Sequence, residues 1–96
     1  MIAIRKTAVF DRWLARLRDP VGRVAITRRI ELLARGHLGD VRSVAAAVYE
    51  LRVHSGPGYR VYFSRSGETT VLLLIGGDKG SQAADISRAT RMVRED

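Results

Sequence analysis

The stretch YELRVHSGPGYRVYF, residues 49–63, decides the fold of this chain. In its first half, Tyr49, Leu51 and Val53 alternate with polar residues, which is the period of a half-buried strand. The Ser-Gly-Pro-Gly sequence that follows supplies the backbone angles of a tight turn. The alternation then resumes from Tyr59, so the sequence predicts a β-hairpin.

The two sides of this hairpin differ in chemistry. Tyr59, Val61 and Phe63 fall on the apolar side, which we expect to pack against helices. The opposite side gathers a carboxylate, two guanidinium groups, an imidazole and a phenol, carried by Glu50, Arg52, His54, Arg60 and Tyr62. A sheet needs only one apolar face, so we expect the second face to stay open and to have a function.

Helical periods precede the hairpin. Residues 2–6 alternate like a short strand, and Thr7 is placed to cap the helix that follows. Apolar residues at spacings of three and four from Phe10 predict that helix. Asp19, followed by a proline, predicts the start of a second helix, which ends near Gly36. The two form a predicted helical hairpin.

The remaining segments complete an α+β domain. Residues 36–47 show no apolar period and are predicted to form a loop. The apolar run TTVLLLIGG, residues 69–77, predicts a strand covered on both faces. Ser81 is placed to cap a last helix. The expected architecture is a single domain, residues 1–96, with helices on one face of a small, mostly antiparallel sheet.

Composition limits the classes of function. The 96 residues contain no cysteine, which excludes disulfides and thiolate chemistry, and two histidines, so we expect no metal and no cofactor. The net charge of +7 predicts a polyanionic partner, with nucleic acid first. No apolar run is long enough to span a bilayer, and the N-terminus lacks the pattern of a signal peptide. We therefore expect a cytoplasmic protein without membrane contact.

The polar face suits RNA cleavage by attack of a 2′-hydroxyl on the adjacent phosphate. Arginine stabilises the charge that develops on phosphorus, and either Glu50 or His54 would exchange the proton. The GGDKGSQ sequence, residues 76–82, predicts a helix N-terminus that favours an anion, with Lys79 beside it. The candidate catalytic residues are Arg60, Arg52, Glu50, His54 and Lys79, and the candidate substrate-binding residues are Tyr62, Arg65 and Ser81.

The same residues also have structural interpretations. Glu50 and Arg52 are placed for cross-strand ion pairs, and His54 for a solvated position beside the turn. The Gly-Asp-Lys-Gly sequence has no unique phosphate signature, and Asp78 disfavours an anion next to it. A surface that only docks phosphates is a further alternative, although Arg and Lys alone would suffice for it.

Two motifs together carry a resemblance to a known family. The stretch at residues 49–63, followed by LLLIGGDKGSQAADISRA at residues 72–89, resembles the phage-derived addiction-module killer proteins. These are HigB-like toxins of the RelE/ParE superfamily of type II toxin–antitoxin systems. The resemblance implies a RelE-like fold and an mRNA endoribonuclease (an mRNA interferase) of the bacterial cytoplasm, usually acting on ribosome-bound message.

The resemblance also implies partners. An antitoxin encoded beside the toxin holds it inactive, and in this branch it is typically a helix-turn-helix repressor. Operator DNA is then contacted through the toxin–antitoxin complex. The ParE branch of the superfamily shares the fold but poisons DNA gyrase without cutting RNA, which leaves gyrase inhibition as the alternative function.

Carried over position by position, the resemblance covers only part of the site. Arg60 matches the family arginine assigned to the transition-state phosphate, Arg52 a basic strand position, and Lys79 the basic residue after the last strand. Better-known ribosome-dependent members carry two lysines where this chain has Glu50 and Arg52, and a tyrosine where it has Ile86. The identity of the general base is therefore left open between Glu50 and His54.

Overall fold

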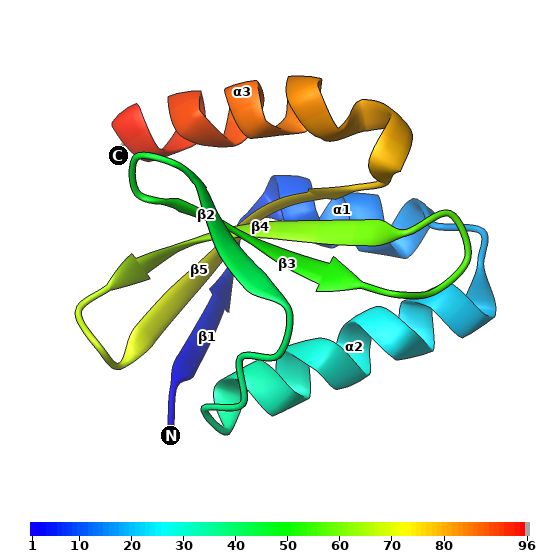
Figure 1. Cartoon of the computed structure of the whole chain (residues 1–96), viewed down its shortest axis with the longest axis horizontal. Coiled ribbons are helices and arrows are strands. Elements are labelled where there is room, and N and C mark those ends of the chain that lie inside the picture. The colour runs from blue at the N-terminus through cyan, green and yellow to red at the C-terminus, as the bar shows by residue number, and fades with distance from the viewer. Residues whose placement is uncertain (96) are drawn as a thin grey trace.

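A five-stranded mixed sheet lies between helices on both of its faces (Figure 1). The computed structural model describes residues 1–95 of the chain. The strand order is β1-β5-β4-β3-β2, in which β1 runs parallel to β5 and all other neighbours are antiparallel. The elements in chain order are β1 (Ala3–Lys6), α1 (Ala8–Arg16), α2 (Pro20–Ala34), β2 (Val41–Ala45), β3 (Val48–Val53), β4 (Tyr59–Ser66), β5 (Thr70–Gly77), the short 3₁₀ helix η1 (Lys79–Ser81) and α3 (Gln82–Arg94). This is an α+β fold, as the sequence predicts.

The predicted helical hairpin and its caps are confirmed. The Thr7 hydroxyl accepts a hydrogen bond of 3.0 Å from the backbone N–H of Phe10 at the start of α1. The Asp19 carboxylate accepts one of 2.9 Å from the N–H of Gly22 at the start of α2. Each cap satisfies a donor that the first helical turn leaves free, which is why both helices begin where they do.

The face under α1 and α2 is an apolar core. Phe10, Ile26 and Leu33 of the helices are fully buried there. They pack against Leu51 and Val53 of β3, Tyr59, Val61 and Phe63 of β4, and Val71 and Leu73 of β5. The apolar side of the predicted hairpin is therefore confirmed.

Helix α3 overturns the expectation that all helices lie on one face. It crosses the opposite face of the sheet from α2 (Figure 1). Its Ile86 and Ala89 pack with Val48, Tyr62 and Leu74 in a second apolar cluster. The strand β5 is thus covered on both faces, as predicted, but the polar face of the hairpin is not open, because alternation does not indicate which element will cover a face.

The predicted loop at residues 36–47 is wrong in its second half. Residues Val41–Ala45 form β2, which pairs antiparallel with β3 at the edge of the sheet. The connecting turn contains Ala47 with a φ of 63°, a left-handed angle that alanine rarely adopts. Without the Asn-Gly or Asp-Gly pair typical of such turns, the sequence carries no hairpin signal here. The consequence for the site is that Arg42 lies opposite Glu50.

Helices in the described part of the chain are too short or too polar to cross a membrane.

Candidate functional site

A buried carboxylate organises the polar side of the hairpin. Glu50, in the middle of β3, is fully buried under the beginning of α3. Its Oε1 accepts hydrogen bonds from Nε of Arg52 at 3.0 Å and from Nε of Arg42 at 3.2 Å. Its Oε2 accepts one of 2.8 Å from the side-chain amide of Gln82, the first residue of α3. Strands β2 and β3 and helix α3 are therefore joined through one side chain.

Arg60 and Tyr62 complete this group from β4. Arg60 is opposite Arg52, and Tyr62 is opposite Glu50. The Nε atom of Arg60 lies 3.8 Å from Glu50 Oε2, beyond hydrogen-bond distance, and Nη1 donates to the carbonyl of Gly58 at 2.9 Å. We call Glu50, Arg42, Arg52, Arg60, Tyr62 and Gln82 the Glu50 cluster.

Two polar atoms of the Glu50 cluster are buried without partners. Within residues 1–95, neither Arg60 Nε nor the Tyr62 hydroxyl has a hydrogen bond. Tyr62 is fully buried, and Arg60 is 7% exposed. Buried polar atoms are nearly always paired in folded proteins. These two atoms are therefore unusual features of the cluster.

Neighbouring charges and hydrogen bonds determine which side chains of the Glu50 cluster are ionised. Burial acts to raise the pKa of Glu50, but the hydrogen bonds from Gln82 and Arg52 and the charge of Arg42 outweigh it, so the pKa lies below its ordinary value. Burial, followed by the adjacent Glu50 carboxylate, raises the pKa of Tyr62. At neutral pH the site therefore presents an ionised carboxylate, three guanidinium groups and a neutral phenol.

His54 lies outside the buried cluster, at the end of β3. Its side chain is 75% exposed, and Nε2 lies 2.7 Å from Oδ2 of Asp40. Asp40 is held next to the strand, because its carbonyl accepts a hydrogen bond of 2.9 Å from the N–H of Arg52. The pair orients the imidazole at the end of the strand, a contact that the sequence did not predict.

The anion site predicted at the start of the last helix is wrong. The N–H groups of Gly80 and Ser81 donate to Oδ1 of Asp78, at 2.8 and 3.2 Å. The carboxylate of this chain thus occupies the position that a phosphate would need. Ser81 does not cap α3 with its side chain. Instead its hydroxyl donates to Oδ2 of Asp85 at 2.5 Å, and Lys79 is exposed beside it.

Arg65 is also separated from the Glu50 cluster. It shares the alternation of Phe63, so it lies on the face opposite Arg60. Five residues of strand separate it from Arg60, roughly 17 Å. Sequence reasoning missed Arg42 and Gln82 as members of the site. Neither had a local signal, because residues 41–44 do not alternate and Gln82 is placed by the path of α3.

The rim of the cluster exposes two guanidinium groups to solvent. The side chains of Arg42 and Arg52 are 52% and 30% exposed, whereas that of Arg60 is 9% exposed. Two accessible guanidinium groups match the oxygens of a phosphate. The described residues contain no group of three histidine, cysteine or carboxylate side chains arranged to hold a metal ion.

Comparison with known proteins places the chain in a family. No protein-family model matches it. It is 40% identical over 94 residues to an uncharacterized protein of Haemophilus influenzae, and the match covers 98% of this chain and 95% of that protein. The two proteins belong to one family.

Proposed function

We propose that this protein is the toxin of a type II toxin–antitoxin system, with a RelE-like fold, and that it cleaves mRNA without a metal ion. One observation carries the proposal: guanidinium groups from β2, β3 and β4 surround one ionised carboxylate, with an oriented imidazole at the rim. The resemblance of residues 49–63 and 72–89 to HigB-like killer proteins supports it. So does the net charge of +7.

In the proposed reaction the exposed guanidinium groups receive the scissile phosphate. Arg52 and Arg42 neutralise the charge that develops on its oxygens as the 2′-hydroxyl attacks. Glu50 holds both groups in place. Its lowered pKa makes it a weak proton acceptor, which disfavours it as the general base.

His54 is the better candidate for proton exchange. Its imidazole is exposed, it is oriented by Asp40, and it lies two residues from Arg52 on β3. Imidazole exchanges protons readily near neutral pH. In this assignment His54 takes the proton of the 2′-hydroxyl, and the 2′-oxygen forms a bond to phosphorus while the bond from phosphorus to the 5′-oxygen breaks. The products are a 2′,3′-cyclic phosphate and a 5′-hydroxyl, whose oxygen takes its proton from water, and His54 then returns its own proton to solvent.

Arg60 has a conditional role in this proposal. The start of α3 covers it, and the hydrogen bond from Gln82 to Glu50 holds that helix down. A shift of this first turn would release Arg60 toward the phosphate. It would also explain why Arg60 Nε and the Tyr62 hydroxyl have no partners within the described residues.

The proposed partners follow from the toxin assignment. They are ribosome-bound mRNA and a helix-turn-helix antitoxin encoded beside the toxin. Operator DNA would be contacted only through the toxin–antitoxin complex. The site of action would be the bacterial cytoplasm.

Brief induction followed by mapping of mRNA 5′ ends tests the activity. New ends should appear within minutes of induction. Arg52→Ala should lower the cleavage rate by about 10²–10³, the usual loss for one oxyanion donor. His54→Ala should lower it by about 10² or more. Arg65→Ala removes the same charge on the opposite face and should cleave normally. Full cleavage by Arg52→Ala would refute the assignment.

Gyrase inhibition is a second candidate because of one specific observation. Glu50, Arg60 and Tyr62 are all buried, so the cluster as it stands serves the fold more directly than catalysis. A gyrase inhibitor would slow DNA supercoiling in a purified assay, leave mRNA 5′ ends unchanged, and be insensitive to His54→Ala.

A further inference from the structure

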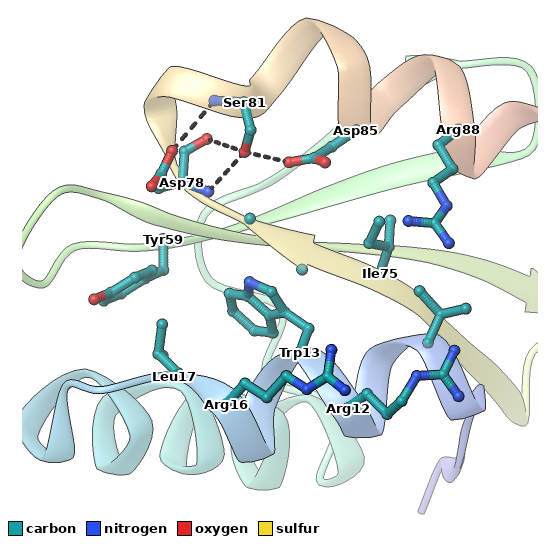
Figure 2. A pocket seen from close by; sticks show the side chains of 13 residues that line it. Arg12, Trp13, Arg16, Leu17, Tyr59, Ile75, Asp78, Ser81, Asp85 and Arg88 are labelled. Carbon is teal, nitrogen blue, oxygen red and sulfur yellow. Dashed lines mark hydrogen bonds between the residues drawn. The ribbon is translucent and has the colours of Figure 1, made fainter.

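A polar cleft separates α1 from the start of α3 at the edge of the sheet (Figure 2). It arises because β1 stops at Lys6, opposite Leu73, whereas β5 continues to Gly77. The last residues of β5 therefore form the floor, with a helix on either side. The cleft has a volume of about 610 Å³, within the range of small-ligand sites.

Two glycines in the floor let side chains of the walls lie directly against the strand. A Cβ on Gly76 would collide with the indole of Trp13, and one on Gly77 would collide with the carboxylate of Asp85. Both walls therefore approach the backbone of β5 closely. The Glu50 cluster contributes no residue to the lining, so this is a separate site.

One end of the cleft is strongly cationic. Arg12 and Arg16 reach it from α1, and Arg88 from α3 (Figure 2). Within residues 1–95 none of the three guanidinium groups lies within ion-pair distance of a carboxylate, so they repel one another, and a phosphate with several oxygens would relieve that repulsion.

The other end of the cleft is acidic and would repel a second anion. Asp78 and Asp85 line it, and carboxylates accept hydrogen bonds but donate none. Between the two ends, Trp13 and Tyr59 present aromatic rings packed edge to face, with centroids 6.3 Å apart. A ligand that fits this lining has an anionic end, a flat middle and N–H donors at its far end.

We propose that this cleft binds a nucleoside phosphate. The phosphate lies among Arg12, Arg16 and Arg88, and the base lies along Trp13. The N–H groups of the base point to Asp78 and Asp85. Guanine suits this end best, because its Watson–Crick edge presents adjacent N–H donors. The proposal does not depend on RNA cleavage, and the ligand is either a free nucleotide or a nucleotide within an RNA strand.

The protein contains a single tryptophan, so its fluorescence reports directly on the cleft. Titration of the full chain with GMP should change the emission of Trp13 with saturation, and calorimetry should give the same affinity. GMP should bind at least tenfold more tightly than inorganic phosphate or guanosine. Equal binding of inorganic phosphate and GMP, or no change up to millimolar GMP, would overturn the proposal.

Variants that each remove one positive charge distinguish binding in the cleft from general electrostatic attraction to a basic protein. Arg12→Gln and Arg88→Gln should each weaken GMP binding by about tenfold, the usual effect of losing one charge-assisted contact. Arg28→Gln removes the same charge from the exposed surface of α2 and should leave the affinity unchanged. An equal loss in all three variants would overturn the proposal.

A last pair of measurements identifies the source of the ligand. If RNA is the ligand, a short single-stranded RNA should compete with GMP and bind more tightly than it. If a free nucleotide is the ligand, GMP should bind more tightly than the RNA. Because binding is read from fluorescence, it is independent of cleavage: a protein that binds GMP but leaves mRNA intact would refute the proposed function and retain this inference.

Discussion

The two faces of the sheet bury their side chains in different ways. Under α1 and α2, β4 places Tyr59, Val61 and Phe63 into a continuous apolar core. Under α3, the same strand places Arg60 and Tyr62 beside the Glu50 carboxylate, with apolar contacts around them. The first face is held by the hydrophobic effect, whereas the second combines it with a network of charges.

The tyrosines of β4 show the difference within one strand. The Tyr59 hydroxyl donates to Oδ2 of Asp19 at 2.6 Å, and this bond to a carboxylate is the main reason that its pKa is raised to about 12. The Tyr62 hydroxyl is buried without a partner in the described residues. On the side of α1 and α2 the buried tyrosine hydroxyl has a hydrogen-bond partner. On the side of α3, Arg60 Nε and the Tyr62 hydroxyl have none within the described residues. Buried polar groups without partners are rare in folded proteins, so the α3 side is the unusual one of the two.

Removal of Glu50 should have the largest effect on stability. Glu50→Ala leaves Arg42, Arg52 and Arg60 close together without their shared anion, and breaking a buried ion pair from one side typically costs about 3–5 kcal/mol. Urea unfolding followed by circular dichroism measures the loss. The comparison predicts that this single polar residue matters as much as a large core side chain.

Glu31→Ala is the matched control for Glu50→Ala, because Glu31 is exposed on α2. It should change the free energy of unfolding by less than about 0.5 kcal/mol. A similarly small change for Glu50→Ala would show that the charges under α3 are not coupled to folding, and the contrast between the two faces would then be wrong.

The apolar face should depend on Trp13. Its indole lies over Gly76 of β5 and beside Phe10, with ring centroids 5.8 Å apart. Because Trp13 is partly exposed, Trp13→Ala should cost about 3 kcal/mol, the lower end of the range for aromatic truncation. The same urea titration measures it. A change well below 1 kcal/mol would show that the indole adds nothing to the core.

The two faces should also differ in their response to acid. The pKa of Glu50 is lowered from 4.5 in the folded state, so the unfolded chain binds more protons at acidic pH. The stability contributed by Glu50 is complete above its unfolded pKa and is lost as the pH falls through its folded pKa. The effect should be smaller than that of removing the side chain.

Glu50→Gln tests this acid dependence, because an amide does not titrate in this range. Unfolding free energies measured from pH 6 to pH 3 should fall less steeply for Glu50→Gln than for the unmodified protein. Identical slopes would show that Glu50 has the same pKa in the folded and unfolded chains, contrary to the prediction.

Local patterns were sufficient to predict most elements but not the covering of the second face. The caps at Thr7 and Asp19 and the alternation of β3 and β4 depend on neighbouring residues, and all are confirmed. The strand β2 was missed because its turn at Ala47 lacks the usual glycine or asparagine. The parallel pairing of β1 with β5 joins residues about 67 positions apart, as in Ala3 with Thr70, and leaves no local trace.

The sequence correctly predicted which residues share the polar face, but not that most of them would be buried. Alternation correctly placed Glu50, Arg52, Arg60 and Tyr62 on one face. It could not indicate that α3 would bury three of them, because burial depends on the path of the chain after Gly77. The ion pair of Glu50 with Arg52, considered from the sequence as a structural alternative, is present at 3.0 Å. Whether these residues also act on RNA stays a prediction.

Removing one tyrosine hydroxyl from each face should have the smallest effect on stability. This pair of changes also tests the contrast between the two faces most directly. Tyr62→Phe deletes a fully buried hydroxyl that has no partner in the described residues. The unfolding free energy should stay the same or rise by up to about 1 kcal/mol, since the desolvation cost of that group disappears. Tyr59→Phe deletes a hydroxyl bonded to Asp19 and should instead destabilise the protein. Parallel urea titrations compare the two variants. If Tyr62→Phe were the more destabilising change, the hydroxyl would have a partner in solution, and the polar face would be as fully satisfied as the apolar one.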